Sequence, residues 1–461
     1  MAVAEPEPQV AEDLLEIYDQ AAPPFRYWAS VALLIAAVVL DVFDYFVVGY
    51  MVSILGPAWR LTYLQSSIML LGGGVGTILG ALVAGTLADR LGRKWMIVAG
   101  VSICGLCSAA TAAIPAGNWL AFAILRGGVG VGIGTAAAGC TTLLVEYTPT
   151  RLRTLIPSLV VAPVALGLLL AASLVAALSP VLGWRGLSLL GIAPLILGGV
   201  IAWVVPESAR WLLLKGRIDQ ARGIIARHCG RPVLNATWSP PPAAPAPVGF
   251  RELLRHPAAF WLTVISWLGA STANYGVFLW GPMITALLLG IPTAQAAKMF
   301  AVVALAGLIG RIAFSFLPAW IGRRPSGQLM GFGTAICLAG AGLFAHHTVF
   351  GWSAFVVLVA LGALFFDGGL ANMSPYPAEL FPVGLAARGV GLAQAANGVG
   401  KIAGPLCMAL IAGADNQVQP AATIAALQPT FLFLAACGLM VGLVFTFIPI
   451  ETRGRALKMA G

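Results

Sequence analysis

Long apolar stretches recur throughout this chain and constrain its fold more than any other feature. Hydrophobic residues make up 59% of the 461 residues and charged residues only 9%, whereas a soluble chain carries roughly 25% charged residues. Apolar stretches of about 20 residues or more cross a bilayer as helices and exclude the alternating strands of an outer-membrane barrel. We predict an all-α membrane protein with twelve transmembrane helices, at 28–52, 64–88, 95–114, 118–145, 155–178, 184–206, 258–289, 293–318, 325–346, 350–376, 386–413 and 426–449.

The chain contains an internal repeat. The fifteen-residue frame of 80–94 returns 230 positions later at 310–324, with its glycines and terminal basic residues in register. A Glu-x-x-Pro segment at Glu146 returns 233 positions later at Glu379. Two matches at nearly equal offsets indicate two copies of one six-helix unit, hence two six-helix bundles related by pseudo-two-fold symmetry.

The predicted spans divide the chain into five parts. They are an N-terminal tail (1–27), a first bundle (28–206), a linker (207–257), a second bundle (258–449) and a C-terminal tail (450–461). Within the linker, apolar residues of the segment 217–228 share one face, so we expect a short helix on the inner membrane surface.

Arginine and lysine gather in alternate loops between the predicted spans. By the positive-inside rule these loops are cytoplasmic, and both termini then lie inside. The net charge of +9 therefore reflects membrane orientation, and we expect lipid but no nucleic acid as a partner.

Charged residues inside the spans are the first candidates for function, because each costs roughly 2.5–3.5 kcal/mol to insert. Asp41 and Asp44 share one face of the first span, Arg126 lies in the fourth, Asp367 in the tenth and Lys401 in the eleventh. At about 1.5 Å per residue, they lie roughly 18–30 Å from the cytoplasmic side and can surround one central cavity. Structural ion pairs, Arg126 with an aspartate and Lys401 with Asp367, are the alternative.

Other polar residues accompany these charges. Asn274 and Tyr275 precede a Gly-Pro break in the seventh span, and Asn397 precedes Lys401 in a glycine-rich run. Glycines around Arg126 and Lys401 predict grooves for neighbouring helices rather than a dinucleotide site. We predict that these five residues line the substrate site, with interhelical hydrogen bonding as the alternative for the seventh span. With only four histidines, we predict neither a metal site nor an enzyme active site.

Several motifs resemble those of the major facilitator superfamily. The segment 85–94, GTLADRLGRK, is similar to its signature between spans two and three, and Arg126 with its glycines resembles its span-four motif. The segments 206–212, PESARWL, and 451–455, ETRGR, resemble motifs that follow spans six and twelve in sugar-porter-like branches. The resemblance covers nearly the whole chain and implies a secondary transporter that works by alternating access.

The same resemblance implies a cytoplasmic gating motif. Its residues in this chain are Gly85, Asp89, Arg90, Gly92, Arg93, Glu146, Arg151, Glu379 and Arg388. Ala319 and Trp320 replace the Asp89–Arg90 pair in the second copy, so we expect the charged latch between helices mainly in the first half.

The branch of the family is indicated by the intramembrane charges. Asp41 and Asp44 resemble the D-G-x-D element of aromatic acid:proton symporters, with Val42 in place of glycine. Lys401 falls where these symporters and the animal organic-anion carriers tend to have an arginine.

This resemblance implies proton-coupled uptake of a small organic anion, with an aromatic carboxylate as the leading substrate. Arg126 and Lys401 would hold the carboxylate. Asp41 and Asp44 would carry the proton, Asp44 more directly, with Asp367 as the next candidate.

Alternatives are a nicotinate-type vitamin carrier, a sugar or polyol symporter, and a proton-driven exporter. We expect a monomer in a bacterial inner membrane with no cofactor beyond the proton.

Overall fold

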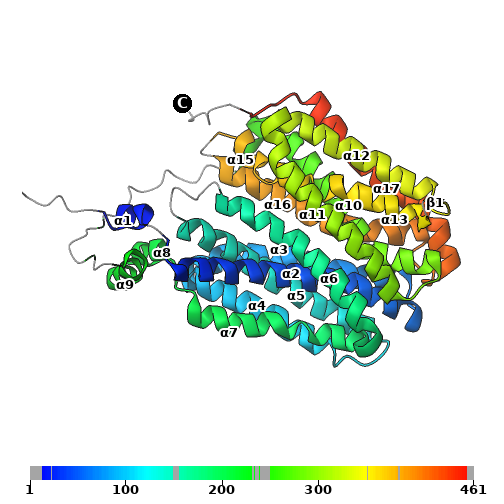
Figure 1. The fold of residues 1–461 in the computed structure, drawn as a ribbon, viewed down its shortest axis with the longest axis horizontal. Helices are drawn as coiled ribbons and strands as arrows, with labels where there is room; N and C mark the ends of the chain where they lie inside the picture. The colour runs from blue at the N-terminus through cyan, green and yellow to red at the C-terminus, as the bar shows by residue number, and fades with distance from the viewer. Residues whose placement is uncertain are drawn as a thin grey trace, which may run out of the picture.

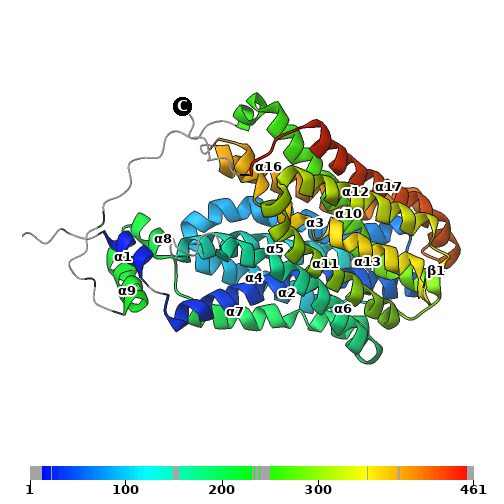
Figure 2. The same ribbon diagram turned by 45° about the horizontal axis from the view of Figure 1, so that its top comes forward.

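The chain folds into two helical bundles that lie side by side (Figures 1 and 2). The computed structural model describes residues 13–21, 23–148, 155–230, 233, 238, 250–349, 351–382 and 385–453, but not the side chains of Gly85, Thr86, Asp89, 155–162 and Phe250. The first bundle contains α2 (Phe25–Ala58), α3 (Tyr63–Leu91), α4 (Arg93–Thr111), α5 (Trp119–Tyr147), α6 (Leu155–Leu189) and α7 (Ile192–Val204). The second contains α10 (Pro257–Leu289), α11 (Thr293–Ile321), α12 (Arg323–Leu343), α13 (Ala354–Phe366), α14 (Leu370–Met373), α15 (Tyr376–Leu380), α16 (Ala386–Ala412) and α17 (Pro420–Phe447).

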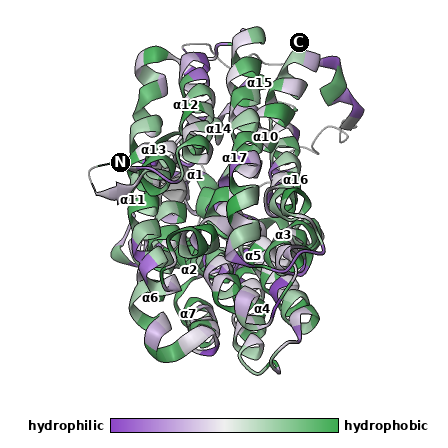
Figure 3. Ribbon diagram, turned by 90° about the vertical axis from the view of Figure 1, so that its right-hand side faces the viewer, coloured by the Kyte–Doolittle hydropathy of each residue, from purple (hydrophilic) through white to green (hydrophobic). Residues whose placement is uncertain are grey.

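The described helices follow the predicted spans closely. Ten are long and apolar enough to cross a bilayer, and much of the helical ribbon has the colour of hydrophobic residues (Figure 3). The shorter α7 and the less apolar α12 occupy the two other predicted positions. Gly183, with a φ of 59°, separates the fifth span from the sixth inside α6, and such a positive φ favours glycine.

Two predicted regions differ in detail from the structure. The tenth span is interrupted, because α13 ends at Phe366 and a turn at residues 367–369 precedes α14. A small hairpin, β1 (Thr348–Val349) with β2 (Trp352–Ser353), precedes α13.

Glycines bring α3 and α5 into close contact. A Cβ built on Gly80 would lie 2.2 Å from the carbonyl oxygen of Val131, and one on Gly130 would lie 2.2 Å from that of Gly73. Gly400 and Gly404 of α16 fit against α10 in the same way. The predicted helix-packing grooves around Arg126 and Lys401 are therefore confirmed, since no larger residue leaves room for these approaches.

We expect Gly80→Ala to lower the free energy of unfolding by about 1–3 kcal/mol, because the added methyl group forces two backbones apart. Gly199→Ala in α7 is the matched control, since nothing lies within 4 Å of its added Cβ. Thermal unfolding of both variants in detergent is the measurement. Equal melting temperatures for the two variants would contradict close α3–α5 packing.

The two bundles are joined at the end of the molecule that carries the β-hairpin. The amides of Tyr63 and Leu64 donate to the carbonyls of Asn416 and Ala414 at 3.0 and 3.1 Å, and Val418 donates to Leu61 at 2.9 Å. Side-chain hydrogen bonds join the two bundles at the same end. Tyr63 and Thr423 share a hydroxyl bond of 2.6 Å, and Ser53 and Thr293 share one of 3.3 Å.

Three short helices form a layer at the opposite end of the first bundle (Figure 1). They are α1 (Leu14–Gln20), α8 (Ala209–Leu214) and α9 (Ile218–Cys229), and a 3₁₀ helix (Phe250–Arg255) leads into α10. Part of the predicted N-terminal tail is thus helical, and Arg210 binds the Asp19 carboxylate at 2.7 Å.

The expected membrane-surface helix exists as α9, but its apolar face does not lie on lipid. Ala221 and Ile225 are fully buried in a cluster with residues of α1 and α8. The apolar face thus packs on protein, and the position of α9 at the membrane surface stays a prediction, because an amphipathic sequence alone does not distinguish a protein partner from a membrane.

Candidate transport site

The first buried cluster is centred on Asp44 of α2, which is fully buried. Arg126 of α5 donates to Asp44 Oδ1 through Nη1 at 3.1 Å and to the Asp44 main-chain carbonyl through Nη2. From α4, Ser108 donates to Oδ1 at 2.9 Å and Cys104 to Oδ2 at 3.3 Å. The guanidinium predicted to hold substrate is therefore engaged by Asp44 in this structure.

Asp41 lies one helical turn before Asp44 and has the opposite environment. Its side chain is 3% exposed, and neither carboxylate oxygen has a hydrogen-bond partner among the residues that the structure describes. An ionised carboxylate without partners is costly in such surroundings. The two predicted proton carriers are thus unlike each other.

A second buried cluster lies in the second bundle around Asp367. Arg311 of α11 donates to both of its carboxylate oxygens, at 2.8 Å through Nε and 2.6 Å through Nη2. Asn274 of α10 also donates to Oδ1 at 3.0 Å. Gly307 makes room for this carboxylate, since a Cβ there would lie 2.7 Å from Oδ2. The alternative pair of Lys401 with Asp367 is therefore wrong, because Arg311 occupies the carboxylate.

Arg311 is the main residue that sequence reasoning missed. It lies inside the predicted span 293–318, so the same insertion cost that singled out Arg126 applied to it. In the sequence Arg311 is the second residue of the repeated frame 310–324.

We expect Arg311→Met to destabilise the protein by about 3–5 kcal/mol, because it leaves Asp367 buried without its cation. The double variant Arg311→Met with Asp367→Asn removes both charges and should recover most of the loss. Thermal unfolding of the two variants and the wild type tests this expectation. A single variant as stable as the wild type would show that the pair is not structural.

Lys401 lies between the bundles. Its Nζ is 5.3 Å from the ring centre of Tyr45 in α2 and 5.4 Å from that of Tyr275 in α10. Its β-carbon lies where a Cβ on Gly74 of α3 would approach within 3.1 Å. In the part of the chain that the structure describes, Lys401 forms no ion pair. The ammonium is therefore held by aromatic faces and remains free to bind an anion.

Aromatic rings surround this ammonium. Phe46 of α2 stacks on Tyr275 at 5.6 Å with an interplanar angle of 3°, and Phe278 packs against Phe46 at 5.8 Å. The hydroxyl of Tyr45 is buried without a partner among the described residues. A cation, an unused hydroxyl donor and stacked rings thus meet at the interface of the bundles. Tyr45 and Phe46 were also missed, although they directly follow Asp44 in the sequence.

The other predicted substrate residue, Asn397, lies one turn before Lys401 on α16. It accepts a hydrogen bond from Ser271 at 2.8 Å and donates to Gln394 at 3.2 Å. Asn397 thus joins α16 to α10 within one bundle. The structure brings Lys401 and Tyr275 together, whereas Asn274 turns to Asp367 and Arg126 to Asp44.

Residues of the predicted gating motif form a charged cluster at the end of the first bundle that carries α8 and α9. Arg93 donates to Glu146 at 3.2 Å. Glu207, which follows the sixth span, accepts from the amides of Arg93 and Lys94 at 2.9 and 3.1 Å. Gly92 begins this turn with a φ of 96°. The cluster therefore ties three helix ends together.

The second bundle repeats this cluster. Arg323 donates to Glu379 at 2.6 Å, and Glu451 accepts from the amides of Arg323 and Arg324 at 3.0 Å each. Gly322 has a φ of 97°. The expectation of a latch mainly in the first half is therefore wrong, because this network does not need the Asp89–Arg90 pair.

Two of the remaining residues of the motif, Arg90 and Arg388, have described side chains. Arg90 is exposed, and Arg388 has one guanidinium nitrogen without an acceptor among the described residues. Arg151 and the Asp89 side chain lie outside the described residues, and Gly85 is described only as helix backbone.

Two apolar bundles of membrane-spanning helices, joined at one end and with a buried cation between them, define a membrane carrier. The chain belongs to the Major Facilitator Superfamily, whose sequence profile matches residues 34–405. This family membership confirms the predicted fold of twelve helices in two bundles.

Comparison with known proteins places the chain near carriers of aromatic acids. It is 31% identical to the niacin transporter NiaP of Acinetobacter baylyi, over 91% of this chain and 93% of the relative. It is 30% identical to a gallate transporter of Pseudomonas putida, over 82% and 84%. A D-xylose-proton symporter structure shares the fold, with a TM-score of 0.74, 17% identity and coverage of 94% and 100%. The resemblance to the aromatic acid branch is thereby confirmed.

Proposed function

We propose that this chain takes up a small aromatic carboxylate together with a proton, by alternating access. The observation that carries the proposal is Lys401, a buried ammonium between the bundles that has aromatic neighbours and no acidic partner in the described chain. The substrate carboxylate would bind Lys401 and the Tyr45 hydroxyl. Its ring would stack on the faces of Phe46 and Tyr275.

The relatives support this substrate class, because the names of NiaP and the gallate transporter both refer to ring-bearing carboxylic acids. Arg126, which the sequence placed beside Lys401, would act through Asp44 rather than on the substrate directly. Nicotinate is the second candidate within the class, favoured by the extent of the match to NiaP.

The orientation and the transport state are inferred from the basic residues at one end of the molecule and from the hydrogen bonds that join the bundles at the other. The basic end with α8 and α9 would face the cytoplasm of a bacterium, and both termini with it. The hydrogen bonds between residues 61–64 and 414–418 would then close the outer side. This structure would be the state of the cycle that takes or releases substrate from inside.

Proton coupling is proposed for Asp41, with the proton as the only coupling ion and no further cofactor. The sequence favoured Asp44, but Asp44 accepts bonds from Arg126, Ser108 and Cys104. Asp44 is therefore occupied by the ion pair with Arg126 in this structure. Asp41, without a partner, is the better candidate to gain and lose a proton.

The test is counterflow in proteoliposomes with labelled benzoate, nicotinate, gallate and xylose. Exchange of one or more of the acids, with none for xylose, is the expected result, and the acid that exchanges fastest identifies the substrate. Exchange of xylose alone would contradict the proposal and support a sugar carrier. Uptake of the substrate into inside-out vesicles only when their interior is acidic would indicate a proton-driven exporter.

A further inference from the structure

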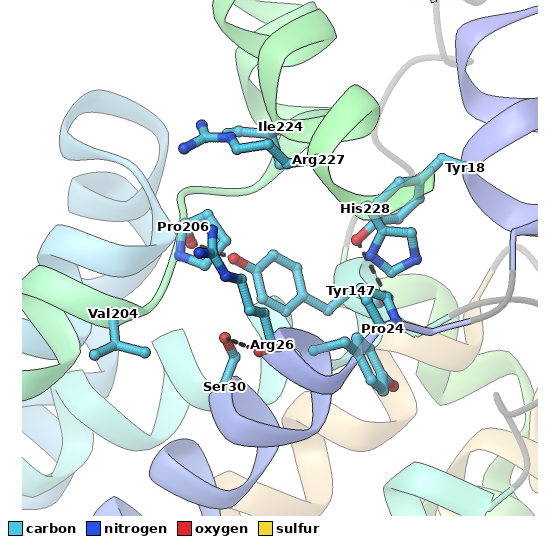
Figure 4. Close-up of a pocket in the computed structure, with 11 residues that line it drawn as sticks. Tyr18, Pro24, Arg26, Ser30, Tyr147, Val204, Pro206, Ile224, Arg227 and His228 are labelled. Atoms are coloured by element: carbon cyan, nitrogen blue, oxygen red, sulfur yellow. Dashed lines mark hydrogen bonds between the residues drawn. The ribbon is translucent and has the colours of Figure 1, made fainter. Parts of the chain in front are cut away.

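A cavity of about 100 Å³ lies at the cytoplasmic end of the first bundle, away from Lys401 (Figure 4). Its walls come from α1, the first turns of α2, the end of α5, the residues that follow α7, and α9. The linker helix α9 thus covers the point at which the first transmembrane helix begins. The transport site does not use this cavity.

Among the described residues, the lining of the cavity includes Arg26, Arg227 and His228 and no acidic residue. In the described chain, the Arg26 side chain has no hydrogen bond or ion pair, and Arg227 uses only Nε, to the Gly223 carbonyl at 3.0 Å. The Nε2 atom of His228 is buried without a partner among the described residues. In Figure 4 the side chains of Arg26 and Arg227 extend from two elements towards the side where Pro206 lies.

Neighbouring acidic groups are engaged elsewhere. Asp19 accepts two hydrogen bonds from Arg210, at 2.7 and 2.9 Å. Glu207 accepts from the main-chain amides of Arg93, Lys94 and Ser208 through Oε1, and its Oε2 has no hydrogen-bond partner among the described residues. In the described chain, neither carboxylate forms a hydrogen bond or ion pair with Arg26 or Arg227.

Hydroxyl groups hold the walls in place. Tyr18 donates to the carbonyl of Tyr147 at 3.4 Å, and Tyr147 donates to that of Pro206. Ser30 donates to the carbonyl of Arg26 at 3.0 Å. These bonds leave the guanidinium groups as the donors available to a ligand, and guanidinium matches phosphate oxygens in geometry and charge.

The cavity lies at the level of exposed aromatic side chains. Phe25, Trp28 and Trp203 are 84%, 41% and 88% exposed, and tryptophan marks the boundary between hydrocarbon and headgroups. Phe25 and Trp28 flank Arg26 on α2, and Trp203 directly precedes the cavity residue Val204. A phosphate at this depth is most readily supplied by a lipid of the inner leaflet.

We propose that this cavity binds the phosphate of an anionic phospholipid, with Arg26 and Arg227 as its contacts and His228 as a further donor. A bound phosphate would connect α9 of the linker to the start of α2. Lipid composition would then influence how firmly the linker is held against the first bundle.

The experiment measures thermal unfolding of the delipidated full chain in detergent, titrated with phosphatidylglycerol, phosphatidylcholine or glycerol 3-phosphate. The proteins are wild type, Arg26→Gln with Arg227→Gln, and the control Lys215→Gln, an exposed cytoplasmic lysine outside the cavity. Unfolding without lipid verifies that each variant is folded, and the single variants replace the double if it is not.

We expect phosphatidylglycerol to raise the melting temperature of the wild type and of Lys215→Gln, and phosphatidylcholine not to. The double variant should require roughly tenfold more phosphatidylglycerol for the same rise. If glycerol 3-phosphate produces the same rise and the double variant loses it, the cavity binds phosphate from solution rather than lipid. The same phosphatidylglycerol response in all three proteins would overturn the proposal.

Discussion

Lys401→Ala is expected to weaken binding of the transported acid by roughly 30-fold or more, because the substrate carboxylate then loses its buried cation. Of the three intramembrane cations Arg126, Arg311 and Lys401, only Lys401 has no carboxylate partner among the described residues. Isothermal titration of the purified protein with the acid identified by counterflow is the measurement.

Two matched variants make this result interpretable. Lys401→Arg keeps the charge and offers a two-pronged grip on carboxylate, so it should retain substantial binding. Lys298→Ala removes an exposed lysine at the start of α11 and should leave binding unchanged. Normal binding by Lys401→Ala would remove the basis for a carboxylate contact between the bundles.

Asp41→Asn is expected to abolish accumulation driven by a pH gradient while sparing exchange of labelled for unlabelled substrate. Amide replaces a carboxyl group that has no hydrogen-bond partner among the described residues, so little structure is lost with it. With one proton per substrate, the wild type should accumulate about tenfold for each pH unit, and the variant should only equilibrate. Both assays are made on the same reconstituted protein.

Asp44→Asn distinguishes the two aspartates. It leaves Arg126 buried without its carboxylate, so we expect loss of stability by about 3–5 kcal/mol and of both transport modes together. If accumulation survives in Asp41→Asn, the proton is carried elsewhere. The Arg311–Asp367 pair is then the next group to test.

Apolar length, the repeat and the loop charges were sufficient to predict the two bundles, because hydrophobic thickness and the cost of buried backbone leave few alternatives. Glycine grooves were also predictable, since a glycine at four-residue spacing has few other uses in a membrane helix. The partners of the buried charged residues could not be predicted. The sequence places Asp367 and Arg311 in the membrane, but only the packing of α11 against α13 shows that they meet.

The candidate substrate site was predicted in part for the same reason. Lys401 and Tyr275 were identified from cost and polarity, which are properties of single residues. Tyr45 and Phe46 are ordinary aromatic residues in a membrane span, and no sequence signal separates them from packing residues. Glu207 and Glu451 lie within family motifs in the sequence. Both accept hydrogen bonds from the first main-chain amides of a helix, α4 and α12 respectively. This shared role could not be predicted, because it depends on how the segments after α7 and α17 fold back.

The closed ion pairs have an electrical consequence for the proposed cycle. Asp44 balances Arg126 and Asp367 balances Arg311, which leaves Lys401 as a constant positive charge and Asp41 as the group whose charge changes in the proposed cycle. Loaded, the carrier holds an ammonium, a substrate anion and a neutral carboxyl group. Empty, it holds an ammonium and an ionised carboxyl group. Both forms sum to zero, so the membrane voltage does no net work on either crossing, and the pH difference alone powers accumulation.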